Sequence, residues 1–233
     1  SRGLGDVYKR QAMQFMWFTQ LGGILSENPL AWNPGRFDQY MYPYYKADKE
    51  AGVITADEAQ ELIECLWLKL SEWVWTISAN TADFFAGYNQ FQNLTVGGRT
   101  RDGKDATNEL SYMCLKATED TLAHQPGLSV RIHPDTPDEF MAAVTHLVSK
   151  GTGFPAIHSD NAGYQMLVNA GYDPEDARDW SNCGCVVPHF RKTGEWTSAA
   201  NLNFAAALEF ATNEGKSRLS GKKIALDEKD PKT

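Results

Sequence analysis

The chain has 233 residues, a formal net charge of −8, 42% hydrophobic residues and 22% charged residues. This length accommodates one large core or two ordinary domains, and the composition is typical of a soluble globular protein. The acidic balance argues against a general nucleic-acid surface, no apolar run approaches the roughly 20 residues of a membrane span, and we recognise no secretory signal.

The two ends of the chain affect how its domains are interpreted. Residues 1–11 contain no initiator Met and no clear periodicity. They resemble translated adapter-type sequence, so we treat them as a non-native leader. Residues 227–233 are polar and contain no closing element. We therefore expect residues 12–233 to be a partial domain, truncated at both ends, of a longer protein.

Helical signals dominate the chain. A capping box at 55–58 precedes apolar residues at helical spacing as far as Leu70. A second amphipathic pattern covers 108–117, and a helix is expected to begin at Thr136 and Pro137 and to end at Gly151. Further helices are predicted over 161–170, 173–180 and 198–213.

Strand signals are fewer and shorter. Residues 128–133 alternate with a period of two, and 154–158 and 185–187 are short apolar runs. Short strands separated by helices indicate an α/β fold with a buried sheet or barrel. The ends of such strands commonly carry active-site loops.

The four cysteines, at 65, 114, 183 and 185, do not resemble a secreted disulfide framework. Cys65 and Cys114 fall within helical patterns, where a free cysteine acts as a small buried hydrophobe. A reducing compartment is indicated, and we expect a cytoplasmic protein.

Cys183 and Cys185 lie in a stretch that also contains Gly184, Pro188 and His189. Glycine permits a tight turn and proline fixes φ, so the stretch predicts a stiff mount for a thiol. From the residues alone three interpretations remain open. The cysteines are buried packing residues, or part of a metal site with His189, or carriers of thiol chemistry.

Five stretches, in the same order, resemble the glycyl radical enzymes, the superfamily of pyruvate formate-lyase. The overall match extends over nearly everything from about residue 12 onward, and these five stretches are its most specific parts. They are 33–45 (NPGRFDQYMYPYY), 94–98 with 102–112 (LTVGG and DGKDATNELSY), 125–133 (QPGLSVRIH), 153–160 (GFPAIHSD) and 184–188 (GCVVP).

The resemblance implies a helix-rich portion of a ten-stranded α/β barrel with two opposed loops. One loop would carry Cys185, the residue that forms a thiyl radical, and Cys183 would be structural. The other carries a glycine that stores the radical, but the family's glycine motif is absent from this sequence. We therefore expect the radical to reside on a missing C-terminal segment, and this fragment to be inactive alone.

The resemblance also implies partners. An activating enzyme with S-adenosylmethionine and an iron–sulfur cluster would install the radical, and the full-length protein would be a homodimer. We expect no metal and no other cofactor bound to this chain.

Position 187 narrows the implied chemistry. Eliminating members of the family carry a glutamate two residues after the cysteine as a general base, but here the residue is Val187. Gly184 stands where pyruvate formate-lyase has the first of two adjacent cysteines, the one that attacks a carbonyl, so the resemblance also disfavours acyl transfer. What remains is hydrogen abstraction with cleavage or formation of a carbon–carbon bond. The candidate types are decarboxylase, succinate-adding and formate acetyltransferase-like. Decarboxylases with glutamate at this position fit less well.

Candidate substrate contacts follow from the same comparison. His189, Arg191 and Lys192 follow the cysteine loop closely, and His189 and Arg191 are taken as substrate contacts. We expect the arginine and the lysine to anchor a substrate carboxylate, although a solvated turn is an equal alternative. Phe91 and Trp196 are candidates for an apolar wall, with core packing as the alternative.

Two arginines and one aspartate of the matched stretches are given structural roles. Arg36 and Arg131 are expected to form structural ion pairs, and Asp160 to cap the helix that follows it.

Two further functions compete with the leading one. A catalytically inactive relative or a small protective subunit would suit the loss of the base at Val187. A thiol or metal site at Cys183, Cys185 and His189 is the other.

Overall fold

The computed structural model describes residues 5–26, 31–73, 91–184, 187–189 and 203–224, with the single residues 79 and 83. The chain divides into two compact units, 1–194 and 195–233.

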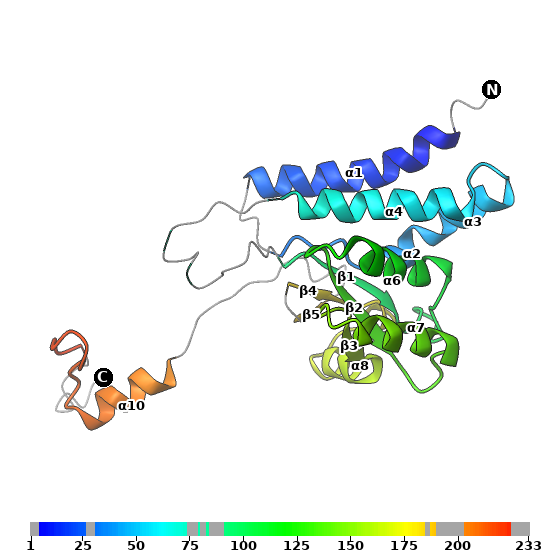
Figure 1. Ribbon diagram of the computed structural model, residues 1–233. Coiled ribbons are helices and arrows are strands. Elements are labelled where there is room, and N and C mark those ends of the chain that lie inside the picture. The colour runs from blue at the N-terminus through cyan, green and yellow to red at the C-terminus, as the bar shows by residue number, and fades with distance from the viewer. Residues whose placement is uncertain are drawn as a thin grey trace. The chain divides into compact units, whose positions relative to one another are not determined.

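Helices form the first part of the larger unit. α1 and α4 lie side by side, and α2 and α3 come between them in the chain (Figure 1). Their bounds are Gly5–Ser26 for α1, Phe37–Tyr40 for α2, Tyr42–Glu50 for α3 and Ala56–Ser71 for α4.

The predicted capping box of α4 is confirmed. The backbone N–H of Glu58 donates to Thr55 Oγ1 at 3.2 Å, and the N–H of Thr55 donates to Glu58 Oε2 at 2.8 Å. The first turn of a helix has no intrahelical acceptor for its N–H groups, so this exchange of bonds fixes where the helix begins.

The second part of the unit is a parallel sheet with helical crossovers. The strands lie in the order β1-β2-β3, and α6 and α7 connect consecutive strands (Figure 1). A parallel pair needs a crossover of this kind because each strand must start again at the same edge. In chain order the elements are β1 (Asn93–Gly97), α6 (Glu109–Thr121), β2 (Gly127–Ile132), α7 (Asp138–Ser149), β3 (Ala156–Ser159), α8 (Asp160–Asn169) and α9 (Pro174–Arg178).

The main core lies between one face of this sheet and the helices. Leu94, Val96, Leu128 and Val130 have no exposed surface and belong to the same cluster as buried residues of α4, α6 and α7. Trp67 of α4 is also fully buried, and its indole Nε1 donates to the hydroxyl of a threonine on α6 at 3.0 Å. The buried indole therefore keeps a hydrogen-bond partner, as such groups require.

A short antiparallel hairpin follows the sheet. It consists of β4 (Ser181–Cys183) and β5 (Val187–His189), with Cys183 paired to Val187 and Ser181 to His189. Of the strand predicted at 185–187, only Val187 lies within the described residues.

The smaller unit contains α10 (Phe204–Thr212). The Asn203 side chain caps this helix, because its Oδ1 accepts from the backbone N–H of Ala206 at 2.9 Å. The sequence predicts a helix over 198–213, so the described helix begins later than expected, and residues 191–202 lie outside the described part.

The start of α1 differs from the sequence prediction. Residues 5–11 form the first part of α1, although the sequence shows no periodicity there. From Ala12 onward α1 packs on the main core through Met13, Met16 and Trp17. That residues 1–11 are a non-native leader stays a prediction.

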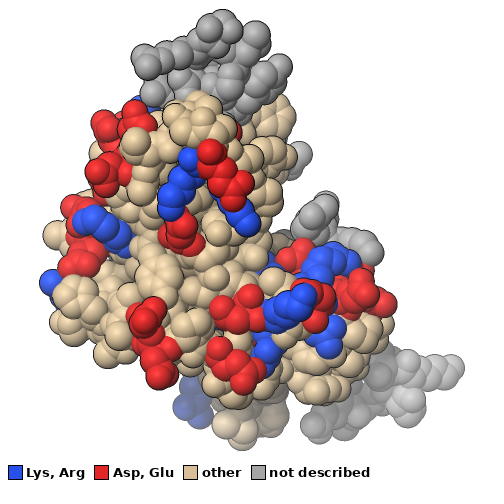
Figure 2. All heavy atoms as spheres, turned by 90° about the vertical axis from the view of Figure 1, so that its right-hand side faces the viewer, with Lys and Arg blue, Asp and Glu red and all other residues tan. Residues whose placement is uncertain are grey.

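The charged surface is mixed. On the face shown in Figure 2, Lys and Arg side chains lie beside Asp and Glu side chains, without a continuous basic patch. Among the described helices, none is long and apolar enough to cross a membrane.

Candidate active site

The hairpin that flanks Cys185 rests on a polar face of the sheet. Thr95 and Ser129 are neighbours in the parallel register and are fully buried. Because side chains alternate along a strand, they lie on the face opposite the main core. The backbone N–H of Asn182 donates to Thr95 Oγ1 at 3.0 Å, and Asn182 Nδ2 donates to Ser129 Oγ at 3.1 Å. β4 is therefore fixed to both β1 and β2.

Gly184, the residue directly before Cys185, is held through both of its backbone groups. Its N–H donates to Asn33 Oδ1 at 3.1 Å, and its carbonyl accepts from Asn93 Nδ2 at 3.2 Å. Its φ is +58°, a left-handed conformation that favours glycine. A Cβ at this position would lie 3.2 Å from the Cβ of Ala31. The predicted tight turn at Gly184 is confirmed.

Asn33 joins this contact to the rest of the sheet. Its Oδ1 also accepts from the backbone N–H of Asn93 at 2.6 Å, and its Nδ2 donates to Cys183 Sγ at 2.9 Å. The segment that carries Asn33 is bonded to β1, because the N–H of Thr95 donates to the Gly35 carbonyl at 2.8 Å. Sequence analysis missed Asn33 and Asn93 as site residues. The sequence signal that could have pointed to Asn33 is its place as the first residue of the family-like stretch 33–45.

The remaining cysteines differ in burial. Cys183 is buried, and its Sγ donates to the Ala31 carbonyl at 3.7 Å, consistent with a structural role. Cys114 is also buried, as predicted, and burial, together with the charge of Asp38, raises the pKa of its thiol. Cys65 is exposed, so the prediction of a buried residue is wrong there. It lies on a face of α4 that the core does not cover.

Arg131 occupies the centre of a buried cluster at one end of β2. Its Nε donates to Asp160 Oδ1 at 2.7 Å, and its other nitrogens donate to the backbone carbonyls of Trp180 and Arg178. Burial and the charge of Arg36 lower the pKa of the Arg131 guanidinium, and Asp160 opposes that shift. The predicted structural ion pair of Arg131 is confirmed.

Two further predictions concern the same region. Arg36 pairs with Asp179 at 3.0 Å, which confirms a structural ion pair. Asp160 does not cap α8. The N-cap is Ser159, whose Oγ accepts from Ala162 N–H at 3.4 Å, because the Asp160 carboxylate is engaged by Arg131 and by Trp180 Nε1.

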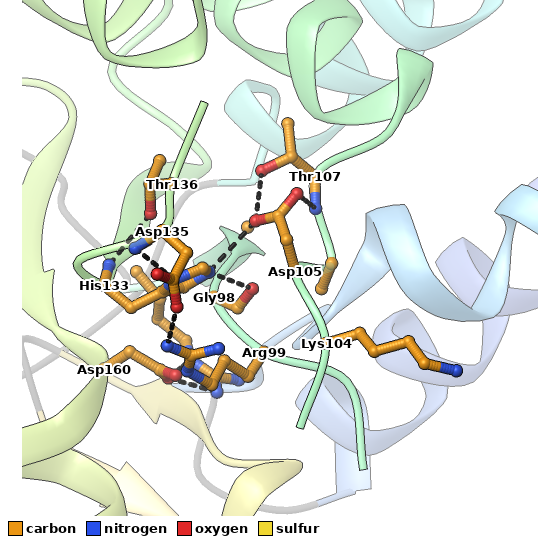
Figure 3. Close-up of polar contacts among 12 residues, drawn as sticks. Gly98, Arg99, Lys104, Asp105, Thr107, His133, Asp135, Thr136 and Asp160 are labelled. Carbon is orange, nitrogen blue, oxygen red and sulfur yellow. Dashed lines mark hydrogen bonds and ion pairs between the residues drawn. The ribbon is translucent and has the colours of Figure 1, made fainter. Parts of the chain in front are cut away.

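His133 fixes the loop between β1 and α6 (Figure 3). Its Nε2 lies 3.1 Å from the Gly98 carbonyl and 3.0 Å from Asp105 Oδ1, and its Nδ1 accepts from the backbone N–H of Asp135 at 3.2 Å. Both neighbours of Nε2 are acceptors, so Nε2 carries the hydrogen. The imidazole thus ties the matched stretch around Asp105 to the end of β2, a structural role.

Two of the predicted substrate contacts lie within the described residues. His189, on β5, is partly buried, and its Nδ1 lies 3.2 Å from the Ser181 carbonyl. Burial lowers the pKa of its imidazole, and the bond to Ser181 partly opposes the shift. The neutral ring therefore donates through Nδ1 and keeps Nε2 as an acceptor.

Phe91 lies two residues before β1, is partly exposed and has a left-handed φ of +55°. The predicted site residues Cys185, Arg191 and Trp196 lie outside the described residues. Their roles stay predictions, as do those of Phe91 and His189.

The metal-site alternative includes Cys185 and so lies partly outside the described residues. Within them, no group of three or more His, Cys, Asp or Glu side chains is arranged to hold a metal ion.

Comparison with known proteins defines the class. A family model described as pyruvate formate lyase-like matches residues 9–233. The chain belongs to the pyruvate formate lyase-like family. As the resemblance implied, its fold is a helix-rich portion of the α/β barrel found in the glycyl radical enzymes.

Three similar proteins illustrate the relationship. The isethionate sulfite-lyase of Desulfovibrio desulfuricans is 36% identical over 227 residues, which are 96% of this chain and 27% of that protein. A structure on 1,2-propanediol dehydration in Roseburia inulinivorans has a TM-score of 0.87 and 37% identity, covering 93% of this chain and 27% of that one. A glycyl radical enzyme from Archaeoglobus fulgidus has a TM-score of 0.85 and 33% identity, covering 94% and 29%. The chain thus spans little more than a quarter of the length of these relatives.

Proposed function

We propose that this chain is the cysteine-loop portion of a glycyl radical enzyme in which Cys185 carries the reacting atom. The Cys185 thiol gives its hydrogen atom to a glycyl radical held elsewhere in the full-length protein, and the sulfur becomes a thiyl radical. The thiyl radical then takes a hydrogen atom from a carbon of a small, carboxylate-bearing substrate. After the reaction the hydrogen returns, so the relay has no net oxidation or reduction.

The observation that carries this proposal is the fixed backbone on both sides of Cys185. Gly184 is held through its N–H and its carbonyl, and Cys183 is paired with Val187 across the hairpin. Hydrogen transfer needs the donor and acceptor atoms at about 3–3.5 Å, so a thiol used in this way needs a rigid mount. A thiol that only filled space in the core would need no such attachment.

Val187 favours one outcome for the substrate radical. A valine side chain cannot accept a proton, so a step that removes one at this position has no base. Cleavage or formation of a carbon–carbon bond needs no proton acceptor there. We therefore propose a decarboxylating, succinate-adding or formate acetyltransferase-like reaction.

The relatives favour elimination as a second candidate. One is named a sulfite-lyase and another structure concerns dehydration of a diol. Elimination by this chain would need a proton acceptor other than the residue at 187. Product analysis separates the two, since elimination releases water or sulfite, and the first candidate releases a carbon fragment or forms an adduct.

The substrate contacts are proposed as expected from the sequence. The Nδ1 of His189 is bonded to the Ser181 carbonyl. The other ring nitrogen, Nε2, would accept a hydrogen bond from the substrate. Arg191 would bind a carboxylate, and Phe91 and Trp196 would form an apolar wall.

Several features of the whole protein belong to the same proposal. They are a cytoplasmic homodimer, an activating enzyme that uses S-adenosylmethionine and an iron–sulfur cluster, and no metal on this chain. The present fragment would be inactive by itself. If the full-length protein cannot be activated, the alternative of a catalytically inactive relative or subunit is favoured.

The test uses the full-length protein, recovered as a complete gene and activated without oxygen. The glycyl radical is measured as a doublet by electron paramagnetic resonance. Turnover is assayed with isethionate, 1,2-propanediol and an arylacetate. The proposal expects a doublet in both the wild type and Cys185→Ala, and turnover in the wild type alone. Absence of the doublet, or turnover by Cys185→Ala, would contradict it.

A further inference from the structure

We propose that Asn33 and Asn93 are positioning residues that set the place of the Cys185 thiol. We call the two side chains the amide clamp. The inference rests on the proposed function of Cys185 and adds to it the residues that orient the reacting atom.

The amide clamp holds one residue by both of its backbone groups. Asn33 Oδ1 accepts from the Gly184 N–H at 3.1 Å, and Asn93 Nδ2 donates to the Gly184 carbonyl at 3.2 Å. The carbonyl belongs to the peptide bond that joins Gly184 to Cys185. Since a peptide unit is planar, holding this carbonyl also restricts the orientation of the Cys185 backbone N–H.

The two halves of the amide clamp are bonded to each other. Asn33 Oδ1 accepts from the backbone N–H of Asn93 at 2.6 Å, so a single oxygen receives two backbone donors. Asn93 is the first residue of β1 and is buried. The clamp is therefore built on the sheet, and a displacement of either side chain would move Gly184 relative to β1.

Further contacts involve Gly184 and the residue before it, Cys183. Asn33 Nδ2 donates to Cys183 Sγ at 2.9 Å, and a Cβ at Gly184 would lie in tight contact with the Cβ of Ala31, at 3.2 Å. The stability of the hairpin does not by itself explain why both backbone groups of Gly184 are bonded to side chains. The hairpin has its own ladder and separate bonds from Asn182 to Thr95 and Ser129.

This role predicts a defect in hydrogen transfer that is separate from any loss of stability. Misplacement of a reacting group by about 1 Å can lower a rate by roughly 100-fold. Loss of the amide clamp should slow transfer between Cys185 and the glycyl radical by at least about tenfold, and leave the amount of radical unchanged.

Deuterium exchange measures this transfer without a known substrate. In D2O the Cys185 sulfur carries deuterium. When the glycyl radical takes that deuterium and later returns a hydrogen atom to sulfur, the α-hydrogen of the glycine is replaced. The radical doublet then collapses to a single line. The rate of collapse, per radical, is the readout in the activated full-length protein.

The variants are Asn93→Asp and Asn33→Ala, with Asn169→Asp as the matched control. Asn93→Asp is almost the same size but sets an acceptor oxygen against the Gly184 carbonyl. Asn169, on α8, accepts only from the exposed side chain of Gln165 among the described contacts. Asn33→Asp keeps the acceptor for Gly184 and should retain more exchange than Asn33→Ala. Melting temperatures are measured in parallel, and Asn93→Asp suffices if Asn33→Ala does not fold.

The inference expects slow collapse in Asn93→Asp and Asn33→Ala, partial recovery in Asn33→Asp, and wild-type collapse in Asn169→Asp. Wild-type rates per radical in the clamp variants would overturn it, even if their melting temperatures fell. Cys185→Ala separates this failure from failure of the proposed function. Collapse that persists in Cys185→Ala, or is absent from the wild type, refutes the hydrogen relay itself.

Discussion

Arg131 and Asp160 form an ion pair with almost no solvent contact, since their side chains are 0% and 3% exposed. It joins β2 to the first residue of α8, beside the polar face on which the cysteine hairpin rests. Removing one partner of such a pair leaves an uncompensated buried charge, which costs far more than the pair itself contributes.

We therefore expect Asp160→Ala to lower the free energy of unfolding by about 3–5 kcal/mol. The control is Asp120→Ala, which removes an exposed (i,i+4) partner of Lys116 and should cost less than about 0.5 kcal/mol. Urea unfolding of the full-length protein compares the two. Equal midpoints for both variants would show that the Arg131 cluster is not structural.

Gly184→Ala tests the conformation beside Cys185. A non-glycine residue in the left-handed region costs about 1–2 kcal/mol, and here the new Cβ would also meet Ala31 at 3.2 Å. Gly52→Ala is the matched control, with a φ of +67° and no heavy atom within 4 Å. Both variants should lose stability, but only Gly184→Ala should lose turnover per radical. If Gly52→Ala loses as much turnover, backbone strain alone explains the effect.

His189 should make the protein sensitive to acid. Burial lowers the pKa of this imidazole below its usual value of about 6.5, so the unfolded chain binds a proton before the folded protein does. The stability from neutral His189 is present above about pH 6.5 and is lost as the pH falls toward the pKa of the folded state.

Melting temperatures of the full-length protein between pH 7.5 and pH 5 check this effect. His189→Gln keeps a donor for the Ser181 carbonyl and has no titratable group. It should therefore lose less stability than the wild type on acidification. A steeper fall in the variant would contradict the assignment.

Features of the fold and the site could be predicted from the sequence where the residues that form them are close together in the chain. The capping box at 55–58 and the alternation of β2 are local, and both were predicted correctly. The sequence does not predict β1 as a strand, because its apolar residues are only Leu94 and Val96. The bond between Asn33 and Gly184 spans 151 residues, and no local pattern indicates it.

The fragment expressed alone should aggregate. Within the described residues, β3 has a strand partner only on the β2 side, and unpaired strand edges promote association between chains. α1 adds exposed apolar side chains, with Phe15 74% and Leu25 78% exposed. Size-exclusion chromatography of the purified 233-residue chain should show high-mass species.

Co-expression with the remaining part of the full-length protein is the control for that experiment and should restore solubility. A soluble monomer of the fragment that unfolds cooperatively would contradict the prediction.

The central claim is that hydrogen passes through the Cys185 sulfur. Its most direct test is the radical spectrum of the activated full-length protein in D2O, recorded for the wild type and for Cys185→Ala. We predict that the doublet collapses to a single line in the wild type and persists in Cys185→Ala at equal radical content. Collapse at the same rate in both proteins would contradict the account.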